Sequence, residues 1–199
     1  SEVHVPRTYS TTFNISDEDS LNLLRVSRPS ADISVVATSL SSSAEGILDT
    51  DHVAVGVGET LWFEVDVHVP HGTTNLTLHI QLPTAGVLLE VHSVQVTDYG
   101  GSAMVLQNEG NVTAQQAGPF ATELVLAFGQ LTNQPDGRSD NDVIKVEVVA
   151  QVRDVSSNGD GQTSTDIAVD VEFGPTTTDR RFEMVEGNMI HVLELGEPE

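Results

Sequence analysis

The chain has 199 residues, with 30 acidic side chains against 8 Lys and Arg, so its formal net charge is −22 at pH 7. A surface this negative repels phosphate backbones and anionic lipid, which excludes nucleic acid and membrane surfaces as expected partners and leaves solubility, cation binding or a salty medium as the explanation of the charge. The absence of cysteine excludes disulfides and thiolate chemistry, and no apolar run approaches the roughly 20 residues of a membrane span, so no membrane insertion is expected.

Residues 1–16 alternate between two faces, which predicts one long strand. Pro6 cannot donate a ladder hydrogen bond and marks an edge or inserted strand. An acidic break, Ser16–Ser20, follows, so residues 1–20 are expected to form an arm separate from the body. The apolar face of this arm carries Val3, Val5, Tyr9, Phe13 and Ile15.

The strongest strand signals lie in Gly58–Leu82. Leu61–Val69 and Leu76–Leu82 each place every second residue on an apolar face, and Pro70-His71-Gly72 separates the two runs. Together they supply nine large apolar side chains to one core. Further strands are expected at residues 31–39, 47–57, 87–96, 103–106, 111–115, 120–128, 144–152 and 167–173, with a bulge at Leu88-Leu89 and a long polar loop at 129–142.

This series of short strands with turns between them predicts an all-β protein, an immunoglobulin-like antiparallel β-sandwich with an extended N-terminal strand arm. The body is expected to cover residues 21–173. Residues 174–199 form a C-terminal extension, in which 182–195 could add one strand or a hairpin around Gly187-Asn188.

Several stretches in this order resemble the conserved-repeat, immunoglobulin-like sandwich modules of microbial surface proteins. They are VGVGETL at 55–61, the turn and strand at 70–81, FGQLTN at 128–133, NDVIKVEVVAQVRDV at 141–155 and TSTDIAVDVEF at 163–173. The resemblance covers roughly residues 31–173 and implies adhesion, a surface layer or a filament rather than catalysis, at a secreted or extracellular location. The chain begins at Ser1 without a signal sequence, as a processed secreted protein or a trimmed chain would.

One module with a spare strand suggests assembly between subunits, as in pilus subunits of the donor-strand kind. The arm side chains Val3, Val5, Tyr9, Phe13 and Ile15 are then expected at the subunit interface, in a groove of the next subunit. The chain would be its own partner in a homo-oligomeric filament. The alternatives are that the arm pairs within its own sheet, that residues 182–195 are the donor, or that the protein is a monomeric adhesin or carbohydrate-binding module using Trp62 and Tyr99.

Three Asn-x-Ser/Thr sequons, at Asn14, Asn75 and Asn111, predict N-linked glycans. Calcium could bind Asp136, Asp140 and Asp142, although turn formation explains these residues equally well. No other cofactor is expected. The outward stripe Glu64, Asp66 and His68, with His79 on the next strand, allows a zinc cluster, but surface histidines are the better interpretation.

No nucleophile elbow, phosphate loop or metalloprotease helix is present in the sequence, and the serines, acids and histidines are too scattered to nominate a triad. The protein is therefore not expected to be an enzyme. Lys145 shares the polar face of its strand with Glu147, which argues against a buried lysine that forms an intramolecular isopeptide bond.

Overall fold

The structure, a computed structural model, describes residues 28–39, 53–102, 104–107, 114–115, 121–139, 141–155, 166–174, 183–190 and 193–195. The strands are β1 Ser30–Thr38, β2 Val53–Val55, β3 Thr60–His68, β4 Gly72–Gln81, β5 Leu89–Asp98, β6 Met104–Leu106, β7 Ala114–Gln115, β8 Glu123–Asn133, β9 Val143–Val152, β10 Ile167–Gly174, β11 Glu183–Ile190 and β12 Leu193–Leu195. The all-β class is confirmed, and the N-terminal arm lies outside the described residues.

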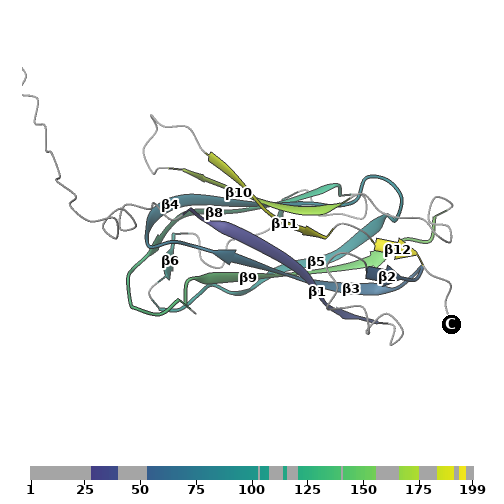
Figure 1. Cartoon of the computed structure of the whole chain (residues 1–199), viewed down its shortest axis with the longest axis horizontal. Helices are drawn as coiled ribbons and strands as arrows, with labels where there is room; N and C mark the ends of the chain where they lie inside the picture. The colour runs from purple at the N-terminus through teal and green to yellow at the C-terminus, as the bar shows by residue number, and fades with distance from the viewer. Residues whose placement is uncertain are drawn as a thin grey trace, which may run out of the picture.

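Two antiparallel sheets face each other (Figure 1). Sheet A has the strand order β1-β3-β9-β5, and sheet C has the order β11-β10-β4-β8-β6, with β7 also on β8. The connections β3–β4, β4–β5, β8–β9 and β9–β10 each cross from one sheet to the other. This arrangement confirms the predicted immunoglobulin-like sandwich.

The core lies between the sheets and is built by the predicted alternation. All nine apolar side chains of the two organising strands are 0–4% exposed. The apolar side chains of β3 project from sheet A and those of β4 project from sheet C, so the two sets of side chains meet across the core rather than within one sheet. The inward side chains of β9, Ile144, Val146, Val148, Ala150 and Val152, are 0–1% exposed as predicted.

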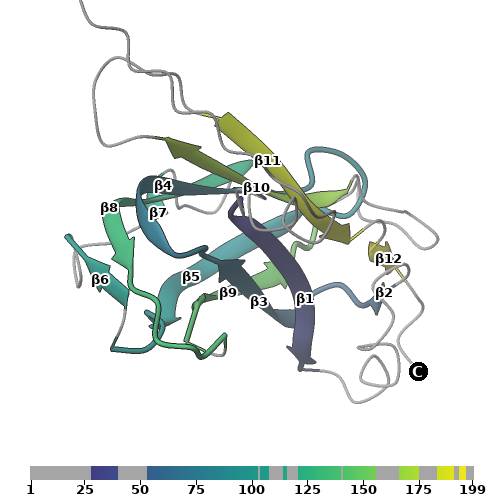
Figure 2. The ribbon, with the colours of Figure 1, turned by 60° about the vertical axis from the view of Figure 1, so that its left-hand side comes forward.

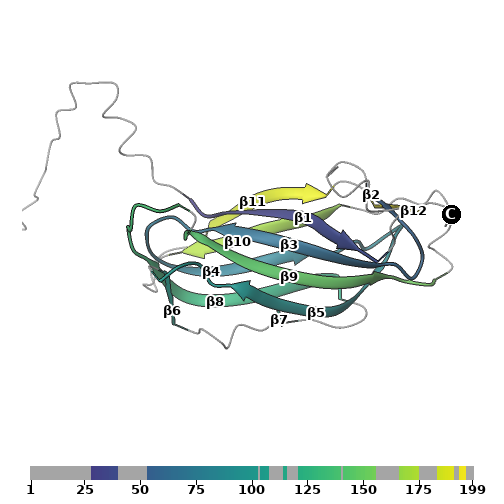
Figure 3. The same ribbon diagram turned by 90° about the horizontal axis from the view of Figure 1, so that it is seen from below.

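The two long sides of the sandwich differ. On one side β1 lies beside β11, so the edges of the two sheets cover each other (Figures 2 and 3). On the other side sheet A ends at β5, and sheet C ends at the short strands β6 and β7. Four of the five partly buried hydrophobic residues packed against the core, Val94, Val96, Tyr99 and Ala114, lie on or next to these strands, and the fifth, Ala121, precedes β8.

Two predicted boundaries in the middle of the chain are wrong. β5 begins at Leu89, and its register shifts lie between Val91 and Ser93 and between Val96 and Asp98, not at Leu88-Leu89. The predicted loop from residue 129 is still strand, because β8 continues to Asn133. Phe128 is an extra residue in the pairing with β4, and Gly129 has a φ of 69°, which a glycine adopts without strain.

The C-terminal strands attach to both parts of the sandwich. β11 runs unbroken through Gly187-Asn188, where its register against β10 shifts by one residue. The phase slip in the sequence is therefore a bulge and not a hairpin turn. β12 pairs in parallel with β2, as a separate two-stranded sheet at one end of the molecule (Figure 1). No helix in the described ranges is long and apolar enough to cross a membrane.

Candidate functional site

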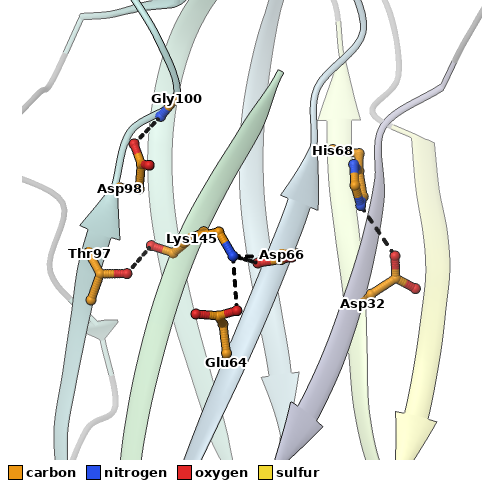
Figure 4. Close-up of polar contacts among 8 residues, drawn as sticks. All are labelled: Asp32, Glu64, Asp66, His68, Thr97, Asp98, Gly100 and Lys145. Atoms are coloured by element: carbon orange, nitrogen blue, oxygen red, sulfur yellow. Dashed lines mark hydrogen bonds and ion pairs between the residues drawn. The ribbon is translucent and has the colours of Figure 1, made fainter. Parts of the chain in front are cut away.

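The outer face of sheet A is a polar surface centred on Lys145, the single lysine of the chain (Figure 4). Lys145 Nζ donates a hydrogen bond of 2.9 Å to Glu64 Oε1 and lies 3.1 Å from Asp66 Oδ1, both on the neighbouring strand β3. All three side chains are only 33–37% exposed, because they lie flat between adjacent strands. The ammonium group thus joins β9 to β3 on the outer surface.

Carboxylates surround this lysine because the strand register brings like charges together. Asp32 of β1 is directly opposite Asp66, and Glu64 is directly opposite Glu147 of β9. Directly opposed like charges destabilise a sheet. Lys145 partly offsets this repulsion, and Gln95 of β5 donates a 2.7 Å hydrogen bond to Glu147 Oε1. The face therefore keeps an excess of negative charge with one cation at its centre.

The hydrogen bonds from Lys145 to Glu64 and then to Asp66 raise the pKa of the lysine above its usual value. A more basic ammonium group is a poor nucleophile at neutral pH, since the free amine is the reactive form. The half-exposed Lys145 side chain on the outer surface of sheet A confirms that it lies on the polar face of its strand. This arrangement is suited to charge pairing and not to covalent chemistry.

A buried glutamate, Glu59, was not singled out from the sequence. It is 1% exposed, its Oε2 accepts a 2.6 Å hydrogen bond from the Gly56 backbone N–H, and its Oε1 accepts one from the Thr38 hydroxyl. Its backbone carbonyl also accepts a 2.8 Å hydrogen bond from Val152 N–H. Glu59 therefore ties together the end of β1, the turn before β3 and the end of β9.

A second buried polar residue, Asn133, lies at the opposite end of the sandwich. It is 1% exposed, and its Nδ2 donates to the Val69 carbonyl at 2.7 Å and to Asp142 Oδ1 at 2.8 Å. The Val69 N–H in turn donates to the Asp142 carbonyl at 2.8 Å. Asn133 thus fixes the β3–β4 turn against the loop between β8 and β9.

The proposed calcium residues lie in this loop. Asp136 accepts hydrogen bonds from Asn141 Nδ2 at 2.9 Å and from Arg138 N–H at 2.8 Å. The bond from Asn141, and then the bond from Arg138, lower the pKa of the Asp136 carboxyl. The Asp142 side chain binds Asn133 and lies 3.5 Å from His71 Nε2. Asp140 is outside the described residues. Among the described residues, no group of three metal-ligating side chains comes together. Calcium binding therefore stays a prediction.

The zinc hypothesis was wrong, because consecutive strands lie in different sheets. Glu64, Asp66 and His68 point outward from sheet A, and His68 pairs with Asp32 at 3.4 Å. His79 points outward from sheet C, on the opposite face of the molecule. There it lies between Glu123 of β8, at 3.0 Å from Nδ1, and Glu172 of β10, at 3.4 Å from Nε2.

The remaining predicted site residues divide into two groups. The interface residues Val3, Val5, Tyr9, Phe13 and Ile15 and the sequon residues Asn14 and Asn111 lie outside the described residues. Asn75 is half-buried on β4, between Gln130 of β8 and Gly174 of β10 in register. Glycosylation and the arm interface therefore stay predictions.

The two aromatic residues considered for ligand binding are separated. Trp62 is half-buried on the outer face of sheet A, between Ala37 and Val149 in register, and Tyr99 packs against the core. A shallow depression of about 470 Å³ lies elsewhere, at the end of sheet C. Its described lining residues are Gln81, Leu82, Thr84, Thr122, Glu123 and Asp166, none of them aromatic.

A comparison of the sequence with models of known protein families finds no match, and a comparison with curated protein sequences finds none. Solved structures with a similar arrangement of strands include BcpA, the major pilin subunit of Bacillus cereus, at 11% identity over 84% of this chain with a TM-score of 0.49. This chain spans 40% of that pilin.

Two others are similar at a comparable level. A non-cellulosomal cohesin from the archaeon Archaeoglobus fulgidus is 13% identical over 73% of this chain and 86% of its own, with a TM-score of 0.39. The T6 backbone pilin of Streptococcus pyogenes serotype M6 is 12% identical over 85% of this chain and 36% of its own, with a TM-score of 0.43. At such values the fold assignment depends on the strand pairing itself, and the function on the residues.

Proposed function

We propose that this chain is a structural subunit of an extracellular filament or surface layer, which assembles when the arm at residues 1–16 of one copy inserts beside the body of the next. The proposal is carried by a pattern in the sequence: residues 1–16 alternate between apolar and polar positions, and they precede a body with a core of its own. The described core runs from Ala31 to Val171. The arm's apolar face, with five large side chains, lies in sequence before that core begins.

The charge of the two parts supports pairing between copies. Residues 1–16 hold one acidic side chain, Glu2, and one basic side chain, Arg7, in a chain with 30 acids. Two bodies that each carry a strong negative charge repel each other. A nearly neutral strand with alternating apolar residues is the part of the chain that can approach a neighbour at little electrostatic cost.

A head-to-tail contact of this kind propagates unless rotation closes it into a ring, so it produces fibres. The affinity comes from main-chain hydrogen bonds, and the register comes from alternate side chains. Burying the five apolar side chains contributes on the order of 10 kcal/mol before ordering costs, at about 1.5–3 kcal/mol each.

Negative-stain electron microscopy and light scattering of the full chain test the proposal. Filaments are expected from the full chain and are expected to be lost when residues 1–16 are removed. A matched pair of full-length variants separates the effect of arm sequence from that of arm length. Val5→Asp with Phe13→Asp charges the apolar face and is expected to abolish filaments, whereas Ser10→Asp with Thr12→Asp charges the polar face and is expected to retain them. Equal, stable monomers in every case would overturn the proposal.

The second candidate function is a monomeric module that binds a hydroxyl-rich ligand such as a carbohydrate. The depression at the end of sheet C favours it, because amide, carboxylate and hydroxyl groups from Gln81, Glu123 and Thr122 line an open hollow. Glycan-array binding that is lost in Gln81→Ala, from a protein that stays monomeric, would support this function over the filament.

A further inference from the structure

The open side of the sandwich offers one long edge strand. β5 pairs with β9 on one side, and no described strand pairs with its other side. The other edges are covered or short, since β1 lies beside β11, β6 has 3 residues and β7 has 2. An unpaired edge presents a row of free N–H and C=O groups, which is a template for another strand.

The core is incompletely covered at this same edge. Val94 and Val96 point inward and are directly opposite Val148 and Val146 of β9, which are 1% and 0% exposed. Val94 and Val96 themselves are only partly buried. A strand placed beside β5 would continue the inner face of sheet A and cover these two side chains. Its apolar residues would have to be two positions apart.

The polar side chains of β5 leave the edge accessible. Gln95 Nε2 bonds to Glu147 Oε1, and the Thr97 hydroxyl lies 3.4 Å from the Lys145 carbonyl oxygen, so both turn toward β9 (Figure 4 shows the Thr97 contact). Register shifts at either end limit the regular run to Ser93–Val96. Bulges block indiscriminate pairing, so this edge accepts a short strand in a fixed register.

The chain enters β1, the edge strand of sheet A opposite β5, at the end of the sheet where β5 also ends. Ser30 pairs with His68, which pairs with Val143, and two residues further along β9 Lys145 pairs with Asp98. The chain thus enters β1 at the end of sheet A where β5 finishes. Residues 17–27, fully extended, span up to about 36 Å. That length lets residues 1–16 reach past their own body to a neighbouring copy.

From this geometry we infer that β5 is the acceptor edge, and that the segment around Phe13 and Ile15 of a second copy pairs with Ser93–Val96. This inference rests on the proposed function, since it names the site that the arm occupies. Phe13 and Ile15 are two positions apart and match Val94 and Val96. The pair Val3 and Val5 fits less well, because Pro6 next to it lacks an N–H donor.

Crosslinking between two single-cysteine variants tests the acceptor, because the chain has no cysteine of its own. Thr12→Cys, on the polar face of the arm, is mixed with Ser93→Cys on the exposed outer face of β5 and treated with a bismaleimide. Two matched controls replace Ser93→Cys, namely Val105→Cys on β6, 55% exposed, and Ser34→Cys on β1. Mass spectrometry identifies the joined peptides.

The expected result is several-fold more heterodimer with Ser93→Cys than with either control. A higher yield with Val105→Cys or Ser34→Cys, from a protein whose filaments require residues 1–16, would overturn the acceptor and leave the proposed function intact. In a double variant that carries Thr12→Cys and Ser93→Cys in one chain, crosslinks within single molecules, without heterodimers from the mixed single variants, would overturn both. Filaments that form without residues 1–16 would overturn the proposed function and the acceptor together.

A charge placed on the edge gives an independent test. Val94→Lys puts an inward charge at the acceptor, a device that blocks strand addition at natural sheet edges, and Val105→Lys is its matched control on β6. Filament mass is expected to fall several-fold for Val94→Lys only, with thermal melting showing that both variants fold. Equal filament mass in a folded Val94→Lys protein would overturn the assignment of β5.

Discussion

Lys145 and Glu64 lie on adjacent strands, with 2.9 Å between Nζ and Oε1, and they form the charged contact at the centre of sheet A's outer face. Asp66 shares the same ammonium group at 3.1 Å. No second lysine exists in the chain, so no neighbouring lysine can replace this cation.

Replacing Lys145 with Met is therefore expected to destabilise the fold by about 1 kcal/mol, the upper part of the range for exposed ion pairs, because the carboxylates of Glu64 and Asp66 lose their shared cation. Lys145→Arg retains the charge and is the control. Urea denaturation measures the difference in unfolding free energy between wild type and Lys145→Met, and this difference should decrease in high salt because the charges are screened. An unchanged midpoint for Lys145→Met in low salt would contradict the expectation.

The same contact predicts a pH dependence. The pKa of Lys145 is higher in the folded state than in the unfolded state. Its contribution to the free energy of unfolding is therefore fully present below the unfolded-state pKa and is lost as the pH rises through the folded-state pKa. The stability difference between wild type and Lys145→Met is thus expected to be constant from about pH 6 to 9 and to decrease above about pH 10.4, the ordinary pKa of lysine. A difference that instead falls between pH 6 and 8 would assign the effect to another group.

The whole fold is expected to be stabilised by salt. A net charge of −22, with acids directly opposed at Asp32 and Asp66 and at Glu64 and Glu147, makes the compact state repel itself. The Debye length falls from about 30 Å at 0.01 M salt to about 8 Å at 0.15 M, so the melting temperature should rise over that range. A chloride series followed by circular dichroism measures it, and a flat or falling melting temperature would be inconsistent with this account.

Asn133 is expected to be the most sensitive polar position at its end of the sandwich. Asn133→Ala removes the donor to the Val69 carbonyl and to Asp142 Oδ1, and it should cost about 2–3 kcal/mol because a buried acceptor loses its partner. Gln134→Ala, at the exposed next residue, is the control and should change stability little. Equal unfolding free energies for the two variants would show that Asn133 does not fix these loops.

Glu59 offers a graded test at the other end. Glu59→Gln keeps an acceptor for the Gly56 N–H, and the Thr38 hydroxyl can rotate to accept from the amide, so a small loss is expected. Glu59→Ala leaves the buried Gly56 N–H without this acceptor and removes one partner of the Thr38 hydroxyl, so it should cost about 2–3 kcal/mol. Hydrogen exchange at Gly56 reports the local effect. Equal losses in the two variants would mean that side-chain size, and not hydrogen bonding, matters here.

Periodicity predicted the strands but not how they are arranged. β3, β4 and β9 are correctly placed by alternation alone, since each has one buried face and one polar face. The same pattern does not say which sheet a strand joins, so alternation alone groups His79 with Glu64 and Asp66 on a face that His79 does not share. Sheet assignment depends on pairing between residues distant in sequence, which a single chain does not display.

The sequence around Glu59 and Asn133 does not indicate that these two polar residues are buried. Glu59 follows Gly58 in a turn, where an acidic residue ordinarily faces solvent. Asn133 precedes Gln134-Pro135-Asp136, a sequence typical of a polar loop, yet β8 extends to it because Phe128 forms a bulge at Gly129. In both cases the burial comes from distant strands, β1 and β9 for Glu59 and the β3–β4 turn for Asn133.

The order of strands in sheet A has a consequence for how the protein is made. β9 lies between β3 and β5, yet it is synthesised after both, so neither can complete its ladder until residues 143–152 exist. Pairings this distant in sequence form slowly, because a long loop must close before any contact is gained. The nascent chain therefore carries unpaired apolar strands for most of its synthesis. Its excess of carboxylates keeps such chains apart, so the acidity that disfavours the compact state also protects the protein from aggregation before it folds.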